Sequence, residues 1–368
     1  MLKLNDVLLR NFRCIFLLFS FLNASFYTLM KVLLSFIFAI ILSAQFSFGQ
    51  SKQYVLILSK GEKKMWVLDY KTLELVNKIP VGEDPHEIEL STDYTTAYVS
   101  NAVTAGTGHI INVIDLKKLE PIKDIDTKPF YVPHGMAYHN DTLWYTAQGS
   151  KCVVAYDVKQ DKPVQVLGTG QDFTHLLYMV PDGNTFYTTN VESGTISIFE
   201  RKWIPPYMPP TLVLPPNAKD RLEWRQSLIN VGVGAEGFDI SGDGKELWTA
   251  LPNGKLVIVD LLEKKITTTI DTHVLGLHRI KITPDGKTVC VVSVKTGDLL
   301  YYNVATHQLE QKVNLGQGAG IFMDKNMNRM FVSCTPNNYV YVIDLNSRKE
   351  IKKIDISRPD GISAVDVP

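Results

Sequence analysis

One short pattern recurs seven times along this chain of 368 residues, and it constrains the fold more than any other feature. Each copy is a strand-like run of alternating apolar residues that begins just after a Pro, Gly or Thr. The first residues of the seven copies, called head residues below, are His86, His134, His175, Glu236, His278, Ala319 and Asp360. Their spacings are 48, 41, 61, 42, 41 and 41 residues. A unit repeated at such a period buries its apolar face by stacking on its neighbours.

Four short strands fill each period. The head strand ends in a tight turn such as Pro181-Asp182-Gly183, in which Asp and Gly supply the turn geometry. A second strand follows, as in 97–101, then a third that carries Asp near its end, as in 257–261, and a more polar fourth, as in 265–270. A period near 40–45 residues made of short strands is typical of β-propeller blades. The chain is therefore predicted to be all-β, a single propeller of seven blades.

The two ends of the repeat region complement each other. Residues 53–81 supply a second, third and fourth strand without a head strand, and residues 361–367 supply a lone head strand. Together they make one blade, so the C-terminal strand is predicted to complete the N-terminal blade in a 1+3 arrangement. Such closure leaves no free sheet edge between the first and last blades.

The 61-residue period contains a proline-rich insertion at about 201–226. Its Pro-Pro pairs at 205–206, 209–210 and 215–216 predict that no regular strand ladder forms there, because proline cannot donate to a ladder. The segment is therefore expected to tolerate shortening. Its aromatic and basic residues suit a lid or an arm that binds a partner, and a loop packed on the wall of the propeller is the competing interpretation.

Residues 1–49 form an apolar leader. Met30 and Lys31, followed by the apolar run 32–42, resemble a complete signal peptide, which places the true start at Met30 and cleavage before Gln50. Residues 14–48 are also long enough to span a bilayer, so a retained N-terminal membrane anchor stays open. The first alternative predicts a periplasmic or secreted protein, and in both the propeller occupies 50–368.

The charge balance excludes one class of function. Without the leader the chain has 38 − 4 = 34 basic and 38 − 1 = 37 acidic residues. This slight acidic excess argues against a nucleic-acid-binding protein and against a polybasic lipid patch, so no membrane contact is expected beyond the leader. The remaining cysteines, Cys152, Cys290 and Cys334, are odd in number and lie in apolar strands, which predicts buried free thiols.

Several strands carry the signature of a known family. The segments Tyr-Val-Ser-Asn at 98–101 and Phe-Tyr-Thr-Thr-Asn at 186–190, with the Val-Ile-Asp-Leu strands and Pro-Asp-Gly turns, resemble the YVTN-repeat seven-bladed propellers. These are secreted proteins of bacteria and archaea, related to lactonase-like propellers. The resemblance covers residues 53–367 and implies the same fold and export. It implies no single activity, because such propellers include binding modules, lyases, lactonases and metal enzymes.

The head residues are the candidate functional site, because in a closed ring they meet at the mouth of the central channel. The predicted set for a small-molecule ligand or a protein partner is His86, His134, His175, Glu236, His278, Arg279 and Asp360. Strand alternation argues against Arg279, which would turn away from the channel if His278 faces it. A divalent or transition metal ion is the predicted cofactor, with His86, His134, His175 and His278 as its candidate ligands.

Three interpretations of the ring compete. It holds a ligand or metal without chemistry, or it catalyses a metal-assisted lyase or lactonase reaction in which His134, His175, Glu236 and His278 do acid–base work. Alternatively, the histidines bond only to backbone carbonyls and plug the channel. No Gly-x-Ser-x-Gly motif and no covalent haem motif are present, so binding without catalysis is the favoured prediction.

Overall fold

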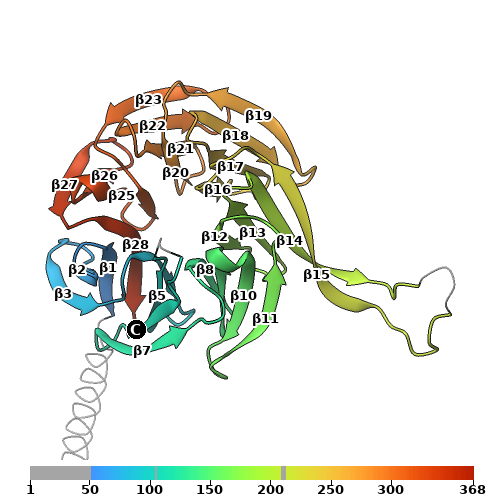
Figure 1. Ribbon diagram of the computed structural model, residues 1–368. Coiled ribbons are helices and arrows are strands. Elements are labelled where there is room, and N and C mark those ends of the chain that lie inside the picture. The colour runs from blue at the N-terminus through green and yellow to red at the C-terminus, as the bar shows by residue number, and fades with distance from the viewer. Residues whose placement is uncertain (1–50, 104–105, 209–212) are drawn as a thin grey trace, which may run out of the picture. The chain divides into compact units, whose positions relative to one another are not determined.

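Seven four-stranded antiparallel sheets are arranged around a central channel (Figure 1). The computed structural model describes residues 51–103, 106–208 and 213–368, so the predicted leader lies outside the described residues. Residues Lys52–Pro368 form one compact unit. The all-β, seven-bladed propeller predicted from the repeats is confirmed. Within the described part of the chain, no helix combines the length and the apolar character needed to cross a membrane.

Each blade takes its four strands in chain order from the channel outward, except the closing blade. Blades 1 to 3 comprise β4 (Pro85–Leu90), β5 (Thr96–Asn101), β6 (Ile110–Asp115) and β7 (Glu120–Asp126); β8 (Pro133–His139), β9 (Thr142–Ala147), β10 (Cys152–Asp157) and β11 (Lys162–Gly168); and β12 (Thr174–Met179), β13 (Thr185–Asn190), β14 (Thr195–Ile204) and β15 (Arg221–Asn230).

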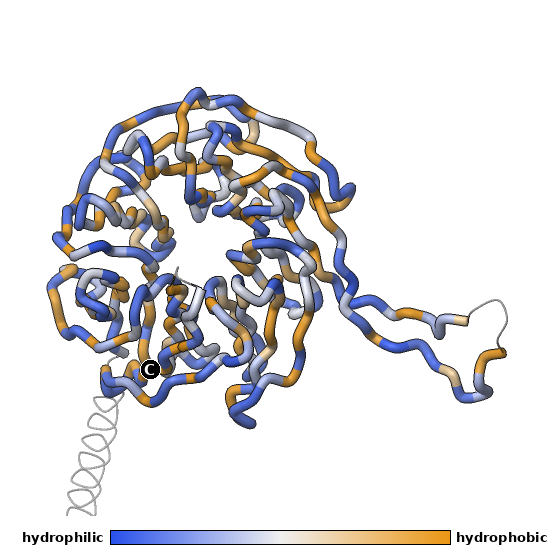
Figure 2. Tube along the Cα trace, viewed as in Figure 1, coloured by the Kyte–Doolittle hydropathy of each residue, from blue (hydrophilic) through white to orange (hydrophobic). Residues whose placement is uncertain are grey.

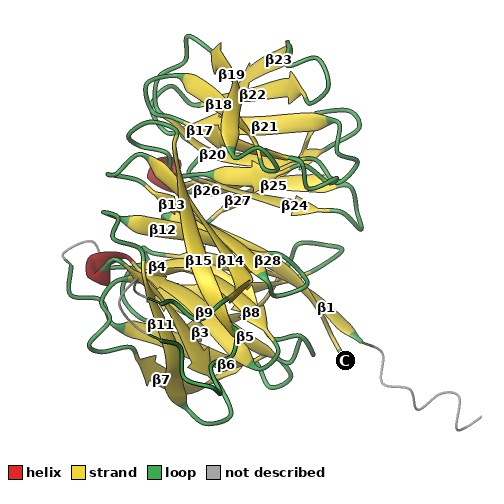
Figure 3. Cartoon of the chain, turned by 90° about the vertical axis from the view of Figure 1, so that its right-hand side faces the viewer, coloured by secondary structure: helices red, strands yellow, loops and turns green. Residues whose placement is uncertain are grey.

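Blades 4 to 6 comprise β16 (Phe238–Ile240), β17 (Glu246–Ala250), β18 (Lys255–Asp260) and β19 (Lys265–Asp271); β20 (Leu277–Ile282), β21 (Thr288–Ser293), β22 (Asp298–Asn303) and β23 (Leu309–Asn314); and β24 (Gly320–Asp324), β25 (Arg329–Cys334), β26 (Tyr339–Asp344) and β27 (Glu350–Asp355). Two short 3-10 helices, η1 (Gln148–Ser150) and η2 (Thr335–Asn337), join the second and third strands of blades 2 and 6 (Figure 3).

Blade 7 closes the ring with strands from both ends of the chain. Its order is β28 (Pro359–Val367), β1 (Lys52–Ser59), β2 (Lys64–Asp69) and β3 (Leu75–Pro80). The register runs from Lys52 opposite Val367 to Ile57 opposite Ile362. The predicted 1+3 closure is therefore confirmed.

The hydrophobic core is divided among the interfaces between neighbouring blades. In β1, Leu56 and Leu58 pack in the cluster shared with blade 1, whereas Val55 and Ile57 pack in the cluster shared with blade 6. A strand buried on both faces has to be apolar at consecutive positions rather than at alternate ones. This explains the unbroken apolar run in β1 and its counterparts. The predicted free thiols of Cys152, Cys290 and Cys334 are buried in these interfaces.

In blades 2, 3 and 6 a side chain of the second strand joins the blade to the next one. Thr146 Oγ1 donates a hydrogen bond of 2.6 Å to the carbonyl of His175, and Thr189 Oγ1 donates one of 3.0 Å to the carbonyl of Glu236. Ser333 Oγ repeats this contact with the carbonyl of Asp360. In these three blades the Ser or Thr of the second strand therefore fixes the backbone of the next head residue.

Glycine follows the head residue where two inner strands come closest. A Cβ on Gly135 would lie 2.6 Å from the carbonyl oxygen of His175, and one on Gly237 would lie 2.5 Å from that of His278. A Cβ on Gly361 would meet the carbonyl oxygen of His86 still more closely. These positions exclude any side chain, so the small residue sets the spacing of the blades.

The insertion in blade 3 forms a projecting hairpin. Strands β14 and β15 pair without interruption from Thr195 opposite Asn230 to Ile204 opposite Arg221. The prediction that no ladder forms within 201–226 is thus wrong for its two ends, because every proline lies between Ile204 and Arg221. Trp224 also packs on the core, with its ring centroid 5.6 Å from that of Trp144. A shortened loop therefore has to leave Trp224 in place.

A buried carboxyl group joins blades 1 and 2. Glu89 Oε1 on β4 accepts a hydrogen bond of 2.9 Å from the backbone N–H of Tyr138 on β8. Burial, together with the nearby charge of Glu87, raises the pKa of Glu89 to about 7 despite this hydrogen bond. Asp239 occupies the same place in blade 4, where it accepts from the N–H of Ile282 but also pairs with Lys281.

We predict that Glu89→Gln removes a decline in stability between about pH 4.5 and 7. In that window the folded state binds a proton that the unfolded chain has released, so the free energy of unfolding falls as the pH rises through the raised pKa. Gln keeps the acceptor oxygen and has no charge to bury. At pH 8 the variant should be more stable by about 2–3 kcal/mol, measured by denaturant unfolding. Asp239→Asn is the control, which should not gain stability because it leaves Lys281 without its partner.

Candidate functional site

β-bulges set the directions of the side chains at the mouth of the channel. The ladder between the first two strands shifts register between Pro85 and Ile88 in blade 1 and between Leu277 and Ile280 in blade 5. The same shift occurs in blades 2, 3 and 7. A bulge places two residues opposite one, so two consecutive side chains can face the same side. Both His278 and Arg279 consequently face the channel, which corrects the expectation from strand alternation that Arg279 turns away.

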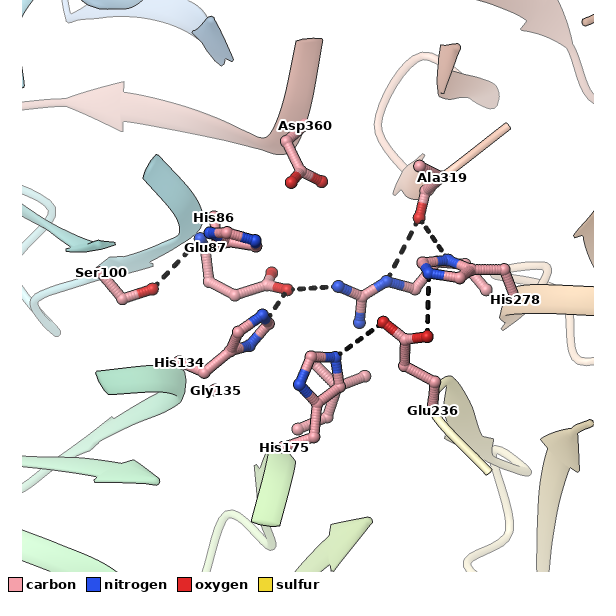
Figure 4. A network of polar contacts seen from close by, with 12 residues as sticks. His86, Glu87, Ser100, His134, Gly135, His175, Glu236, His278, Ala319 and Asp360 are labelled. Carbon is pink, nitrogen blue, oxygen red and sulfur yellow. Dashed lines mark hydrogen bonds and ion pairs between the residues drawn. The ribbon is translucent and has the colours of Figure 1, made fainter. Parts of the chain in front are cut away.

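The predicted head residues lie in one continuous arc (Figure 4). The ring centroids of His86 and His134 are 4.8 Å apart, and those of His134 and His175 are 3.8 Å apart. Beyond them the Glu236 carboxylate lies between two imidazoles, with Oε1 3.0 Å from Nε2 of His175 and Oε2 2.9 Å from Nε2 of His278. The structure thus brings together five residues from five blades.

His86 and Asp360 are joined through a residue that the sequence did not single out. Lys60 Nζ, in the turn after β1, donates to Nε2 of His86 at 2.7 Å and forms an ion pair with Asp360. The other ring nitrogen of His86, Nδ1, donates to the carbonyl of Asp84 at 2.7 Å. Both nitrogens of His86 are therefore occupied. Burial opposes ionisation of Asp360, but Lys60, His86 and Arg279 together outweigh it and lower the pKa of this carboxyl.

Two imidazoles of the arc have buried nitrogens without hydrogen-bond partners. They are Nδ1 of His134 and Nε2 of His175, and the latter is close to Glu236 in distance but lacks hydrogen-bond geometry. Nδ1 of His175 lies 3.0 Å from Oε1 of Gln148 and donates to it in the orientation assigned to that amide. In that tautomer Nε2 of His175 carries a lone pair instead of a proton. It then faces Oε1 of Glu236, which is also a hydrogen-bond acceptor.

Burial decides the charge of these groups. It holds the pKa of His134 well below its usual range, reinforced by the imidazoles of His175 and His86. It also lowers the pKa of His175, outweighing the opposite effect of Glu236. Burial opposes ionisation of Glu236 as well, but there the imidazoles of His278 and His175 prevail and hold the pKa of the carboxyl well below its usual range. These shifts favour a neutral His134 beside an ionised Glu236.

An ion pair crosses the channel beside this arc. Arg279 Nη2 on blade 5 donates to Oε1 of Glu87 on blade 1 at 2.7 Å, and Arg279 Nε donates to the carbonyl of Ala319 at 3.3 Å. Glu87 Oε1 also lies 4.0 Å from Nδ1 of His134. Sequence reasoning missed Glu87, although it follows His86 as Arg279 follows His278. Strand alternation gave no signal for it, because the bulge in blade 1 turns Glu87 toward the channel.

A cavity of about 160 Å³ lies along the channel. Glu87, Arg279 and Asp360 form part of its wall, and Tyr178 and Lys281 from further along the inner strands form another part. The rest of the lining is largely apolar, from residues such as Leu176, Phe238, Ile321 and Ile362. The channel thus provides a partly open space of mixed polarity next to the imidazole arc.

The arrangement does not present a ready-made metal site. Among the described residues, no group of three or more His, Cys, Asp or Glu side chains is placed to hold a metal ion. His175 and His278 contact different oxygens of the Glu236 carboxylate, and His86 has no free nitrogen. A metal ion at the predicted ligands His86, His134, His175 and His278 would need these side chains to turn, so the metal stays a prediction.

Comparisons with known proteins identify the architecture. No family model matches the sequence, and no curated protein matches it. A putative 6-phosphogluconolactonase from Bacteroides fragilis superposes with a TM-score of 0.66 at 15% identity, covering 87% of this chain and 99% of that one. The periplasmic gluconolactonase of Pseudomonas aeruginosa gives 0.65 at 16% identity, covering 86% and 100%. The chain is a seven-bladed propeller with the lactonase-like fold.

The same fold occurs in a protein of quite different description. A chain of hydrazine synthase from Kuenenia stuttgartiensis superposes with a TM-score of 0.60 at 16% identity, covering 76% of this chain and 88% of that one. At such identities the likeness shows the fold alone, and function has to be argued from the site. This propeller carries its own set of channel residues, described above.

Proposed function

We propose that this chain is an exported binding protein that holds a small ligand at the mouth of its central channel. The binding residues are His86, His134, His175, Glu236, His278, Arg279 and Asp360. One observation carries the proposal: Nδ1 of His134 and Nε2 of His175 are buried without hydrogen-bond partners. Buried polar atoms are rarely left unsatisfied, and an absent ligand, ion or water is a common reason. The periplasmic gluconolactonase that shares the fold and the apolar leader support export.

The charges indicate which ligand groups fit. Arg279 is already paired with Glu87 and Lys60 with Asp360, so neither cation is free for an anion. The Glu236 carboxylate is an acceptor, and so is Nε2 of His175 in the tautomer whose Nδ1 donates to Gln148. A ligand whose hydroxyl groups both donate and accept, such as a polyol, satisfies these two atoms and also Nδ1 of His134 in either tautomer. A divalent metal ion is the other occupant that neutral imidazoles and a carboxylate attract, once the side chains turn.

The test measures binding to the chain from Gln50, purified without a histidine tag. Titration calorimetry with sorbitol, glucono-lactone, Zn²⁺ and Cu²⁺ separates polyol from metal binding. His175→Gln should weaken the binding of the active probe at least tenfold, because an interaction with a charged or buried group is lost. His273→Ala is the control, since His273 is a fully solvated side chain in an outer turn.

His86→Ala distinguishes a ligand site from a structural plug. Because both nitrogens of His86 are occupied within the protein, this change should lower the melting temperature more than it weakens binding. If His175→Gln behaves in the same way, with unchanged binding and a lower melting temperature, the histidines are plugs and the proposal is wrong.

A second candidate function is hydrolysis of a lactone. The observation that favours it is the placement of Glu236 between two imidazoles at 3.0 and 2.9 Å, which can accept a proton from water and pass it on. Hydrolysis of glucono-lactone above the uncatalysed rate, lost in Glu236→Gln, would support it. Repeating the assay with a chelator separates unaided acid–base chemistry from a metal-assisted lyase or lactonase reaction.

A further inference from the structure

The projecting hairpin of blade 3 carries exposed apolar side chains that the rest of the propeller does not cover. We call its described residues, 201–208 and 213–225, the arm; it extends outward from the ring (Figure 1). Trp203 is 68% exposed, Tyr207 78% and Val213 92%. Met208 and Leu214 are exposed as well. Figure 2 shows apolar segments continuing to the far part of the arm.

One face of the arm is apolar along its paired strands. Trp203 stands directly opposite Leu222, and Arg201 stands opposite Trp224, so these four side chains share a face of the two-stranded ribbon. Trp224 belongs to the core contact with Trp144, and Trp203 and Leu222 continue the stripe outward into solvent. Beyond the paired strands, the exposed apolar residues continue with Tyr207, Met208, Val213 and Leu214.

Basic charge is concentrated on the same segment. Residues 201–225 contain five basic residues, namely Arg201, Lys202, Lys219, Arg221 and Arg225, against the two acidic residues Asp220 and Glu223. The rest of the chain after the leader has 34 − 5 = 29 basic and 37 − 2 = 35 acidic residues. The near-neutral charge of the whole chain is therefore the sum of a basic arm and an acidic remainder, which we call the body.

We propose that the arm docks on the surface of an anionic lipid bilayer. Trp and Tyr favour the membrane–water interface, and Lys and Arg near an anionic surface add electrostatic attraction. The acidic body is repelled by that surface, so the charge asymmetry orients the molecule with the arm toward the lipid. The exposed apolar side chains continue past the ribbon to Tyr207 and Val213, so the end of the arm that projects from the ring can enter the interfacial region of a bilayer. This goes beyond the ligand site at the channel and does not depend on it.

The experiment uses residues 50–368, which contain the whole compact unit, in flotation with lipid vesicles. Vesicles of equal parts phosphatidylcholine and phosphatidylglycerol should bind the protein at low salt, and vesicles of phosphatidylcholine alone should bind it far less. Lys202→Gln with Lys219→Gln should lower the partition coefficient about fivefold for each charge removed. Trp203→Ser with Tyr207→Ser should lower it at least tenfold.

Matched controls separate the arm from general surface effects. Leu262→Ser removes an apolar side chain that is 85% exposed on another blade, and Lys287→Gln removes an exposed basic charge. Neither should change the partition coefficient. All variants should have the melting temperature of the wild type, because the substituted side chains lie in solvent. Absence of binding to anionic vesicles, or binding that the arm variants leave intact, overturns the proposal. A dimer in sedimentation velocity that only the Trp203 and Tyr207 variant dissociates would instead assign the arm to a second copy of this chain.

Discussion

A chain that ends at Arg358 is expected to lose cooperative folding. The deletion removes β28, the inner strand of blade 7, whose Val365 and Val367 are buried in the cluster shared by blades 7 and 1. It also leaves the backbone of β1 unpaired over six residues of ladder, from Lys52 to Ile57. An unpaired, flat, apolar edge is a site of aggregation. We expect no sharp thermal transition by circular dichroism and a large aggregated fraction in size-exclusion chromatography.

The control for this deletion removes only Pro368, which follows β28 and is exposed. That chain should melt with the wild type. A point substitution tests the same joint without shortening the chain: Gly361→Ala places a Cβ against the carbonyl oxygen of His86, whereas Gly168→Ala meets nothing within 4 Å. If the chain ending at Arg358 melts within a degree or two of the full chain, closure by β28 contributes nothing to stability.

Loss of Arg279 is expected to destabilise the propeller more than loss of any exposed ion pair. Arg279→Met leaves the Glu87 carboxylate facing His134 without the guanidinium that balances it, and it leaves the Ala319 carbonyl with one donor fewer. Removing one partner of a poorly solvated ion pair leaves an uncompensated charge. Since Glu87 retains some exposure, we expect a loss of about 2–3 kcal/mol in the free energy of unfolding.

A double-mutant cycle isolates this interaction. Glu87→Gln with Arg279→Met removes both charges, so its destabilisation should fall short of the sum of the two single changes by about 1 kcal/mol or more. The pair Lys159 and Asp141, both exposed, provides the comparison, and its cycle should give under about 1 kcal/mol. Additive effects at Glu87 and Arg279 would show that water already screens the pair across the channel.

The architecture was predictable because it depends on a repeat of strand patterns that can be read directly from the sequence. Seven head residues at a spacing near 41, and a first blade that lacks its head strand, determine the number of blades and the closure. The convergence of His86, His134, His175, Glu236 and His278 followed from the same register, since residues at one place in each blade meet at the axis. The number of blades, their closure and the meeting of the head residues depend only on the order of the strands, which the sequence repeat indicates.

The direction of individual side chains was not predictable in the same way. Alternation predicts that Arg279 turns away from the channel, and the bulge at His278 and Arg279 reverses this. Lys60 and Gln148 come from turns outside the repeated head pattern, so no register placed them near His86 and His175. The ladder of the hairpin, finally, depends on where the prolines lie rather than on how many there are.

The contacts between successive blades have a consequence for how the molecule comes apart. Side-chain hydrogen bonds fix the head residues of blades 3, 4 and 7, and β28 of the closing blade packs against β4 of the first. An open array of repeats can fray from either end, because its terminal units have one neighbour each. This ring has no terminal unit. A blade can leave only if two joints break together, so the propeller should unfold as one cooperative whole rather than blade by blade.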